Sequence, residues 1–213
     1  MKKQTVAFLF LFTVLFSGFS RADEGMWLPF LLGRNYEDMK KNGLNLTQEE
    51  IYSINNSSLK DAIVSFGGFC TAEVISKKGL LLTNHHCGYD AIAEASTAEN
   101  NHLDDGFWAK SHAEEIAIPG LTATFVVSIA DVTEQITKNL TDDMTEEERA
   151  MKIKEISDQL TSEALGDSKN KAFVRDFFEG NEFYLFITET YQAVRLAGTP
   201  PESIGKFGHD SDK

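Results

Sequence analysis

Two cysteines enclose the segment that most constrains how this chain can fold. Cys70 and Cys87 are the only cysteines among the 213 residues. Between them the sequence predicts a strand over 70–76, a hairpin turn ending at Gly79, and an apolar strand over 80–83. The apolar residues of this last strand do not alternate with polar ones, so we expect it to be buried on both faces.

The segment ends in Thr83-Asn84-His85-His86-Cys87, which carries the strongest chemical signal in the sequence. A general base must be held rigidly, and a disulfide from the next residue to a neighbouring strand would do that. Of the two histidines, the pattern favours His86 for such a role because it adjoins Cys87, whereas the side chain of His85 would point to the opposite face of a strand. For the same reason these consecutive residues cannot converge on one ion, so we expect no metal and no other cofactor.

The first 22 residues have the pattern of a secretory signal peptide. Lys2 and Lys3 precede an apolar run over 6–16, and Ser20 and Ala22 are small residues at the positions that specify cleavage. The run is shorter than the ~20 residues that a membrane span requires. We therefore expect export, no membrane span after cleavage, and a structural disulfide formed by the two cysteines in an oxidising compartment.

The charge excludes one class of partner. The chain has 20 basic and 33 acidic residues, a formal net charge of −13, and the signal segment holds three of the basic residues and none of the acidic ones. The basic surface of a nucleic-acid-binding protein is therefore absent, and we expect no nucleic acid partner.

The rest of the sequence predicts a mainly β domain with a helical insertion. Further strands are expected over 62–66, 121–129, 183–187 and 189–196, a helix over 142–165, helical pieces within 36–60 with a capping box at Thr47-Gln48-Glu49-Glu50, and a loop-rich segment over 90–114. The helix has an acidic start and apolar residues at near-helical spacing: Met144, Met151, Ile153, Ile156 and Leu160. Several short strands with one helical excursion indicate a β-barrel domain carrying an insertion.

A catalytic triad also needs an orienting carboxylate and a nucleophile. Asp131 follows His86 at about the spacing used by chymotrypsin-like enzymes, but its place between a strand and a helix favours a strand-end or capping role. Neither Gly-Asp-Ser-Gly nor Gly-x-Ser-x-Gly occurs, and Ser203 and Ser211 have no oxyanion-type glycine pattern around them. We expect no serine nucleophile in this chain.

The cysteine-enclosed segment resembles the histidine loop of chymotrypsin-like peptidases. Five blocks resemble, more narrowly, the dipeptidyl-peptidase 7 and 11 family of exported bacterial serine exopeptidases. These blocks are Gly-Met-Trp-Leu-Pro at 25–29, Thr-Asn-His-His-Cys-Gly-Tyr at 83–89, Asp-Gly-Phe-Trp-Ala at 105–109, Gly-Asn-Glu-Phe-Tyr-Leu-Phe at 180–186, and Val-Arg-Leu at 194–196 followed by Pro-Pro at 200–201 and Ile-Gly-Lys-Phe-Gly at 204–208.

The resemblance implies a two-barrel chymotrypsin-like fold with a large helical domain over the active site. By this match His86 is the general base and Cys70–Cys87 the disulfide that holds it. Residues 23–213 would be the N-terminal part of the peptidase domain, containing the first barrel, with residues 1–22 as the signal peptide.

Because members of the family are much longer, the resemblance places the triad Asp, the Ser and the oxyanion hole outside this chain. Asp131 is then structural, and we expect the chain to be a truncated fragment that is inactive and poorly stable alone. The full-length protein would release dipeptides from peptides with a free N-terminus, as a homodimer, in the periplasm or at the surface of a Gram-negative bacterium.

Two other functions fit the residues. The first is a non-catalytic exported binding module that retains the histidine loop as scaffold. The second is an ordinary chymotrypsin-like endopeptidase that uses Asp131 as its triad carboxylate.

Overall fold

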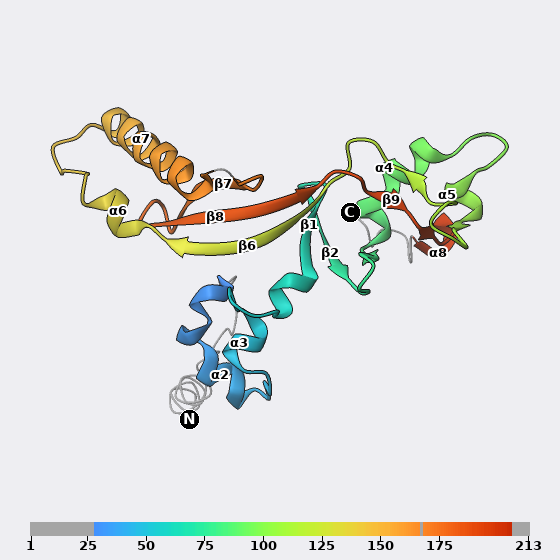
Figure 1. Ribbon diagram of the computed structural model, residues 1–213, viewed down its shortest axis with the longest axis horizontal. Coiled ribbons are helices and arrows are strands. Elements are labelled where there is room, and N and C mark those ends of the chain that lie inside the picture. The colour runs from blue at the N-terminus through green and yellow to red at the C-terminus, as the bar shows by residue number, and fades with distance from the viewer. Residues whose placement is uncertain (1–27, 167, 206–213) are drawn as a thin grey trace, which may run out of the picture.

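The computed structural model describes residues 28–166 and 168–205, so the predicted signal peptide lies outside the described residues. The molecule is elongated, with two long strands, β6 (Ala123–Asp131) and β8 (Glu182–Tyr191), running along its length (Figure 1). Helix α7 (Glu146–Leu165) lies at one end, and α4 (His85–Ala95) and α8 (Glu202–Gly205) lie at the other.

One antiparallel sheet of six strands organises the fold. Its order is β3-β2-β1-β6-β8-β7, so β3 and β7 are its edge strands. The remaining members are β1 (Ile63–Phe66), β2 (Cys70–Val74), β3 (Leu81–Leu82) and β7 (Lys171–Phe177). The expectation of a mainly β fold with helical excursions is confirmed.

Two short two-stranded sheets lie outside this main sheet. In the first, β4 (Phe107–Trp108) pairs with β10 (Gly198–Thr199). In the second, β5 (Ile116–Ala117) pairs with β9 (Arg195–Leu196). Both join the segment after α4 to the segment that follows β8.

The remaining helices are short. They are η1 (Pro29–Arg34), α2 (Tyr36–Lys41), α3 (Gln48–Ile51), η2 (Leu59–Ala62), α5 (His102–Asp105) and α6 (Thr133–Thr137). Within residues 28–166 and 168–205, no helix has the length and apolar character that crossing a membrane needs.

The apolar residues form two separate cores. The first contains Val64, Phe66, Ala72, Cys87 and Ala123, so it lies where the start of α4 meets the sheet. The second contains Val132, Ile136, Phe183 and Leu185, and three of the helix residues predicted from the apolar spacing, Ile153, Ile156 and Leu160, pack against it. The first core positions residues 83–87, which we call the histidine segment, and the second fixes α6 and α7 on the sheet.

The predicted helix begins later than expected. Thr145 caps α7: its Oγ1 accepts from the Glu148 backbone N at 3.2 Å, and Glu148 Oε2 accepts from the Thr145 backbone N at 2.9 Å. This capping box satisfies amide groups that the first helical turn leaves unpaired. Met151 does not face the core, since 59% of it is exposed. The predicted capping box at Thr47 is confirmed.

The strands expected over 62–66, 70–76, 80–83 and 121–129 correspond to β1, β2, β3 and β6. The hairpin of β2 and β3 forms as expected, with Gly79 at φ +79° in the turn. Burial of the second strand on both faces was wrong, because Leu80 is 45% and Leu82 58% exposed. The physical reason is position: β3 is an edge strand with one neighbour in the described sheet.

Further along the chain, one long strand replaces most of two expected strands. The residues expected to form separate strands over 183–187 and 189–196 are mostly in the single strand β8, followed by the short β9. Strand β7 was not predicted. It precedes β8 in a hairpin whose turn contains Gly180 at φ +79°.

Ile136 provides a stability test of the second core. It is fully buried between Val132, Phe183 and Leu185, so Ile136→Ala should leave a cavity and lower the free energy of unfolding by about 2–5 kcal/mol. Urea denaturation followed by circular dichroism measures this. Ile54→Ala is the matched control: Ile54 is 62% exposed, and the change should stay within about 0.5 kcal/mol. Equal losses for both variants would contradict this account of the core.

Candidate active site

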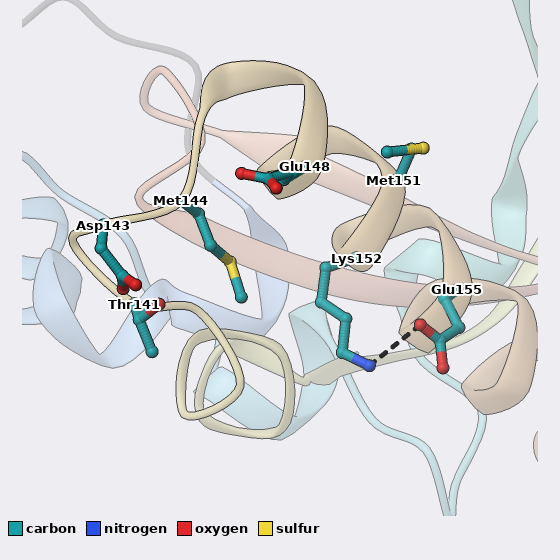
Figure 2. A pocket seen from close by; sticks show the side chains of 7 residues that line it. All are labelled: Thr141, Asp143, Met144, Glu148, Met151, Lys152 and Glu155. Atoms are coloured by element: carbon teal, nitrogen blue, oxygen red, sulfur yellow. Dashed lines mark hydrogen bonds and ion pairs between the residues drawn. The ribbon is translucent and has the colours of Figure 1, made fainter.

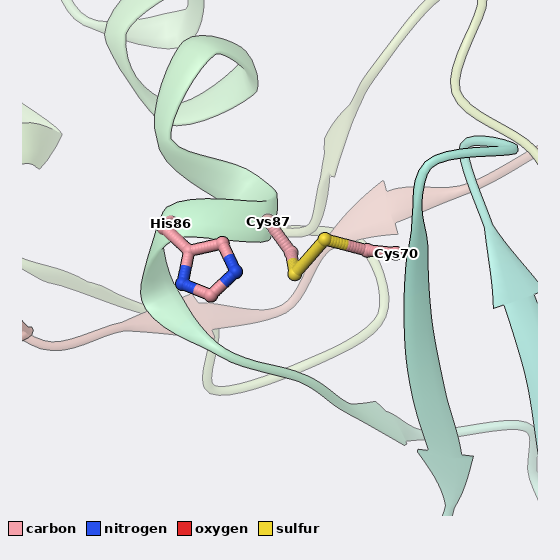
Figure 3. Close-up of side chains that lie close together, drawn as sticks. All are labelled: Cys70, His86 and Cys87. Carbon is pink, nitrogen blue, oxygen red and sulfur yellow. A yellow bond between two sulfur atoms is a disulfide. The ribbon is translucent and has the colours of Figure 1, made fainter. Parts of the chain in front are cut away.

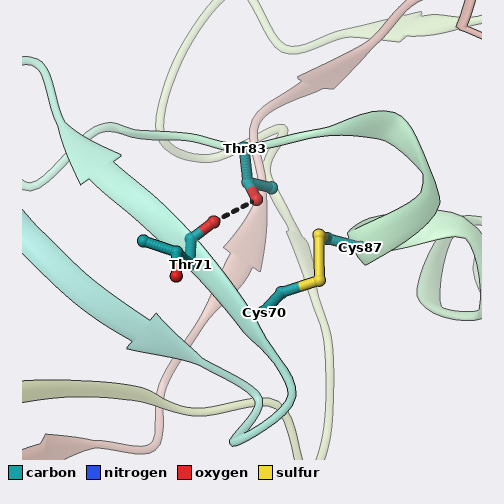
Figure 4. Close-up of a disulfide and its surroundings, with 4 residues drawn as sticks. All are labelled: Cys70, Thr71, Thr83 and Cys87. Atoms are coloured by element: carbon teal, nitrogen blue, oxygen red, sulfur yellow. Dashed lines mark hydrogen bonds between the residues drawn. A yellow bond between two sulfur atoms is a disulfide. The ribbon is translucent and has the colours of Figure 1, made fainter. Parts of the chain in front are cut away.

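A disulfide joins the sheet to the start of helix α4. Cys70 is the first residue of β2 and Cys87 the third residue of α4, and the two form a disulfide with Cα atoms 5.9 Å apart. Thr83 adds a second connection, since its Oγ1 donates to the Thr71 carbonyl oxygen at 2.8 Å (Figure 4). The predicted disulfide is therefore present, and the histidine segment is tied to β2 at two points.

The two histidines lie in a helix and not at the end of a strand. Asn84 is extended and precedes the first turn, and its carbonyl accepts from the Cys87 backbone N at 3.1 Å. Successive residues of an α-helix are rotated by about 100°, so the side chains of His85 and His86 still diverge. The expected divergence is right, but its cause is helical rotation and not strand alternation.

His86 lies beside the disulfide on the exposed side of α4 (Figure 3). One of its ring nitrogens and the sulfur atoms of Cys70 and Cys87 all lie within 4.8 Å of one another. In the disulfide form the two sulfurs are bonded to each other and do not offer thiolates to an ion. The imidazole of His86 is therefore exposed, and its sequence neighbour Cys87 is covalently fixed to β2.

His85 packs in the other direction. Its ring meets the ring of Tyr89 edge-on at 5.9 Å, and an added Cβ at Gly205 would lie 2.3 Å from its Cδ2 atom. Its Nδ1 and Nε2 atoms are buried without a hydrogen-bond partner among the described residues. The Tyr89 hydroxyl donates to Glu202 Oε1 at 3.2 Å. His85 and Tyr89 therefore hold α8 against α4, which nothing in the local sequence indicated.

The segment that follows β8 meets the segment between α4 and β6 in two further contacts. The Arg195 guanidinium lies 3.3 Å from Glu115 Oε2 and also donates to the Glu115 carbonyl oxygen at 2.6 Å. Gly106, at φ +77°, approaches so closely that an added Cβ would lie 2.9 Å from Pro201 Cδ. Three of the sequence blocks, at 83–89, 105–109 and 194–208, thus come together in their described parts.

Asp131 does not join this cluster. It is the last residue of β6, and its Oδ1 accepts from the Thr133 backbone N at 2.9 Å at the start of α6. That end of β6 lies at the opposite end of the molecule from α4 (Figure 1). The strand-end role indicated by the sequence is therefore correct, although the N-cap of α6 is Val132 and not Asp131. The endopeptidase alternative loses its carboxylate. Ser203 is exposed on α8, and Ser211 lies outside the described residues.

A shallow hollow between the end of α6 and α7 offers no alternative site. Its lining residues are Thr141, Asp143, Met144, Glu148, Met151, Lys152 and Glu155 (Figure 2). Lys152 forms an ion pair with Glu155 at 2.9 Å, and the lining contains no histidine, serine or cysteine. This hollow and α4 lie at opposite ends of the molecule (Figure 1).

Comparison with known proteins identifies the family. A model of the Peptidase S46 family matches residues 22–213. Dipeptidyl-peptidase 7 of Capnocytophaga gingivalis is 46% identical over 213 residues, covering 100% of this chain and 30% of that protein. An Asp/Glu-specific dipeptidyl-peptidase of Flavobacterium psychrophilum is 46% identical over 207 residues, covering 96% of this chain and 29% of that protein.

Solved structures show the same likeness to dipeptidyl-peptidases. The crystal structure of Porphyromonas endodontalis DPP11 in complex with the dipeptide Arg-Asp matches with a TM-score of 0.76 and 40% identity, covering 90% of this chain and 28% of that one. The chain belongs to the Peptidase S46 family. The resemblance carried by the five sequence blocks is confirmed, and the chain spans about 30% of the length of the relatives it matches.

Proposed function

We propose that this chain is the N-terminal part of an exported serine-type dipeptidyl-peptidase, in which His86 is the general base. The observation that carries the proposal is the placement of His86: it is exposed on the first turn of α4, next to the cysteine that is bonded to β2. The names of the relatives, dipeptidyl-peptidase 7 and Asp/Glu-specific dipeptidyl-peptidase, support the reaction class.

In the proposed reaction, His86 accepts the proton of a serine hydroxyl as the serine oxygen attacks the carbonyl carbon of the second peptide bond. The imidazolium then gives the proton to the leaving amine, and the dipeptide is released by a second cycle with water. A small displacement of such a base slows the reaction, because proton transfer requires hydrogen-bond distance. The disulfide and the hydrogen bond from Thr83 to Thr71 limit how far the start of α4 can move.

The carboxylate and the nucleophile of the triad are proposed to come from sequence beyond this chain. Asp131 is engaged at the other end of β6, and no serine of the sequence stands in a nucleophile motif. We propose that residues 23–213 contribute the first barrel of a larger peptidase domain and that the chain alone is inactive.

Export is also part of the proposal. Residues 1–22 have the composition of a signal peptide, and a disulfide is stable in the periplasm or outside the cell. Peptides with a free N-terminus are the proposed substrates, and homodimerisation of the longer protein stays a prediction from the resemblance.

Labelling with a serine-directed peptidyl phosphonate tests the missing nucleophile. The purified 213-residue chain should show no covalent adduct by mass spectrometry, because it lacks the activated serine that the reagent requires. Dipeptidyl-peptidase 7 of Capnocytophaga gingivalis, treated in parallel, is the positive control. One adduct per molecule of the 213-residue chain would overturn the proposal that the nucleophile lies elsewhere.

A further inference from the structure

We propose that this chain, once its disulfide is reduced, binds one zinc-type divalent cation through Cys70 Sγ, Cys87 Sγ and a ring nitrogen of His86. These three atoms lie within 4.8 Å of one another (Figure 3). Two thiolates and an imidazole are ligands that Zn²⁺ prefers. This set differs from the three consecutive residues His85, His86 and Cys87, which cannot converge on one ion. Here Cys70, which lies in β2, takes the place of His85.

The distances suit a tetrahedral ion after small side-chain rotations. Zinc lies about 2.3 Å from sulfur and about 2.0–2.1 Å from nitrogen, so tetrahedral ligands are separated by roughly 3.5–3.8 Å. The three atoms are already within 4.8 Å, and their backbones belong to β2 and to the first turn of α4. Among the described residues the group contains three protein ligands, which leaves the fourth position to water.

The start of helix α4 stabilises a thiolate ligand, and the exposure of His86 gives a cation access to the group. Cys87 is the third residue of an 11-residue helix, and the N-terminal end of a helix dipole stabilises a thiolate. His86 is exposed, so an ion can reach the group from solvent, while buried Cys87 fixes the inner side of the site.

The supporting structure does not depend on the disulfide alone. The Thr83 Oγ1 donates to the Thr71 carbonyl oxygen at 2.8 Å, which holds the segment before α4 to β2 (Figure 4). The apolar core around Val64, Ala72 and Ala123 packs with Cys87 from the other side. We therefore expect the two cysteines to remain neighbours in the reduced chain.

A dithiol can serve as the reductant of the Cys70–Cys87 disulfide. The Cys70–Cys87 disulfide takes up two electrons and two protons, and the dithiol is oxidised to its own disulfide. Binding of the cation then forms two metal–sulfur bonds and one metal–nitrogen bond and releases the two thiol protons. Oxidation of the two thiolates to the disulfide removes two ligands and expels the ion.

One consequence rests on the proposed function. A ring nitrogen that donates its lone pair to a metal cannot accept a proton from a serine, so the metal-bound form would lack its general base. Oxidation of the two cysteines to the disulfide would then remove the ion from the imidazole.

Cobalt titration of the 213-residue chain tests the site without any activity assay. The chain is reduced under nitrogen with a dithiol, freed of reductant by gel filtration, and titrated with Co²⁺ as the spectroscopic probe for zinc. We expect the visible absorption bands of tetrahedral cobalt thiolate, saturating at one ion per chain, and no such bands from the disulfide form. Bands of equal strength from the disulfide form would overturn the proposal.

Two histidine variants separate a folded site from chelation by an unfolded chain. Losing even an outer-shell partner of a ligand costs about 10- to 100-fold in metal affinity, so His86→Gln should weaken Co²⁺ binding at least about tenfold. His85→Gln should leave the affinity unchanged, because the ring of His85 packs against Tyr89 and Gly205.

In an unfolded chain both histidines reach Cys87 equally. Equal effects of the two variants, or an unaltered affinity in His86→Gln, would therefore overturn the proposal. Far-ultraviolet circular dichroism of each reduced variant reports its folding alongside. Failure of cobalt binding would leave the proposed peptidase function standing, since that function requires the disulfide form alone.

Discussion

Replacing His86 by glutamine should lower kcat/KM for dipeptide release by about 10²- to 10⁴-fold, which is the contribution of a positioned general base. The measurement needs an active protein. We suggest a chimaera in which this chain replaces the matched 30% of Capnocytophaga gingivalis dipeptidyl-peptidase 7, to which it is 46% identical. The substrates are dipeptidyl chromogenic amides with acidic and with other second residues, because one matching relative is named Asp/Glu-specific and the name of the other states no such restriction.

His112→Gln in the same chimaera is the matched control. The His112 ring is exposed and pairs with Glu115 at 2.7 Å, and we expect activity within about twofold of the parent chimaera because that pair lies at the surface. If His86→Gln kept activity within about threefold of the parent, the assignment of His86 as the base would be wrong. A chimaera that folds but is neither active nor labelled by the phosphonate would favour the binding-module alternative, because its serine would then lack activation by this histidine loop.

Removing the disulfide should markedly lower the stability of the chain. The Cys70→Ser/Cys87→Ser double variant loses a cross-link that closes a loop of 17 residues, which costs about 3 kcal/mol in the loop-entropy description. A complete native domain has about 5–15 kcal/mol in total, and this chain is expected to be less stable than that when alone, so the loss is a large fraction. Urea denaturation of the 213-residue chain, analysed by linear extrapolation, gives the difference in the free energy of unfolding.

The wild-type chain reduced in metal-free buffer is the control for this variant, and its unfolding midpoint should agree with that of the double variant. Agreement would show that the loss belongs to the cross-link and not to the new serine hydroxyls. A double variant whose midpoint equals that of the oxidised wild type would contradict the stabilising role of the disulfide. In the chimaera the same variant should also lower kcat, because the start of α4 is then held to β2 by the Thr83–Thr71 hydrogen bond without the covalent link.

Interactions between residues near in sequence were predictable. The capping box at Thr47, the turn at Gly79 and the pairing of the two cysteines all follow from local patterns or from short loops. The helical insertion was also predicted, because the apolar residues of a long amphipathic helix recur at helical spacing in the sequence. The family resemblance, which rests on short blocks of sequence, was confirmed by the comparisons.

Interactions between distant segments were not predictable. The continuous strand β8 is set by its pairing with β6 along nearly its full length, from Ala123 opposite Tyr191 to Asp131 opposite Tyr184. A local pattern contains no information about such a partner. The exposure of Leu82 likewise depends on whether another strand pairs with β3, which only the sheet order decides.

The histidine segment shows the same difference between local and long-range interactions. By itself the sequence determined that His86 stands next to a cysteine bonded to a neighbouring strand, and that Asp131 lies between a strand and a helix. The tertiary structure decided that both histidines begin a helix, that His85 packs on Gly205, and that Asp131 is at the far end of β6. The reason is physical: caps and turns act within a few residues of the chain and the disulfide closes a loop of 17, whereas the direction of a side chain depends on segments that meet it only after folding.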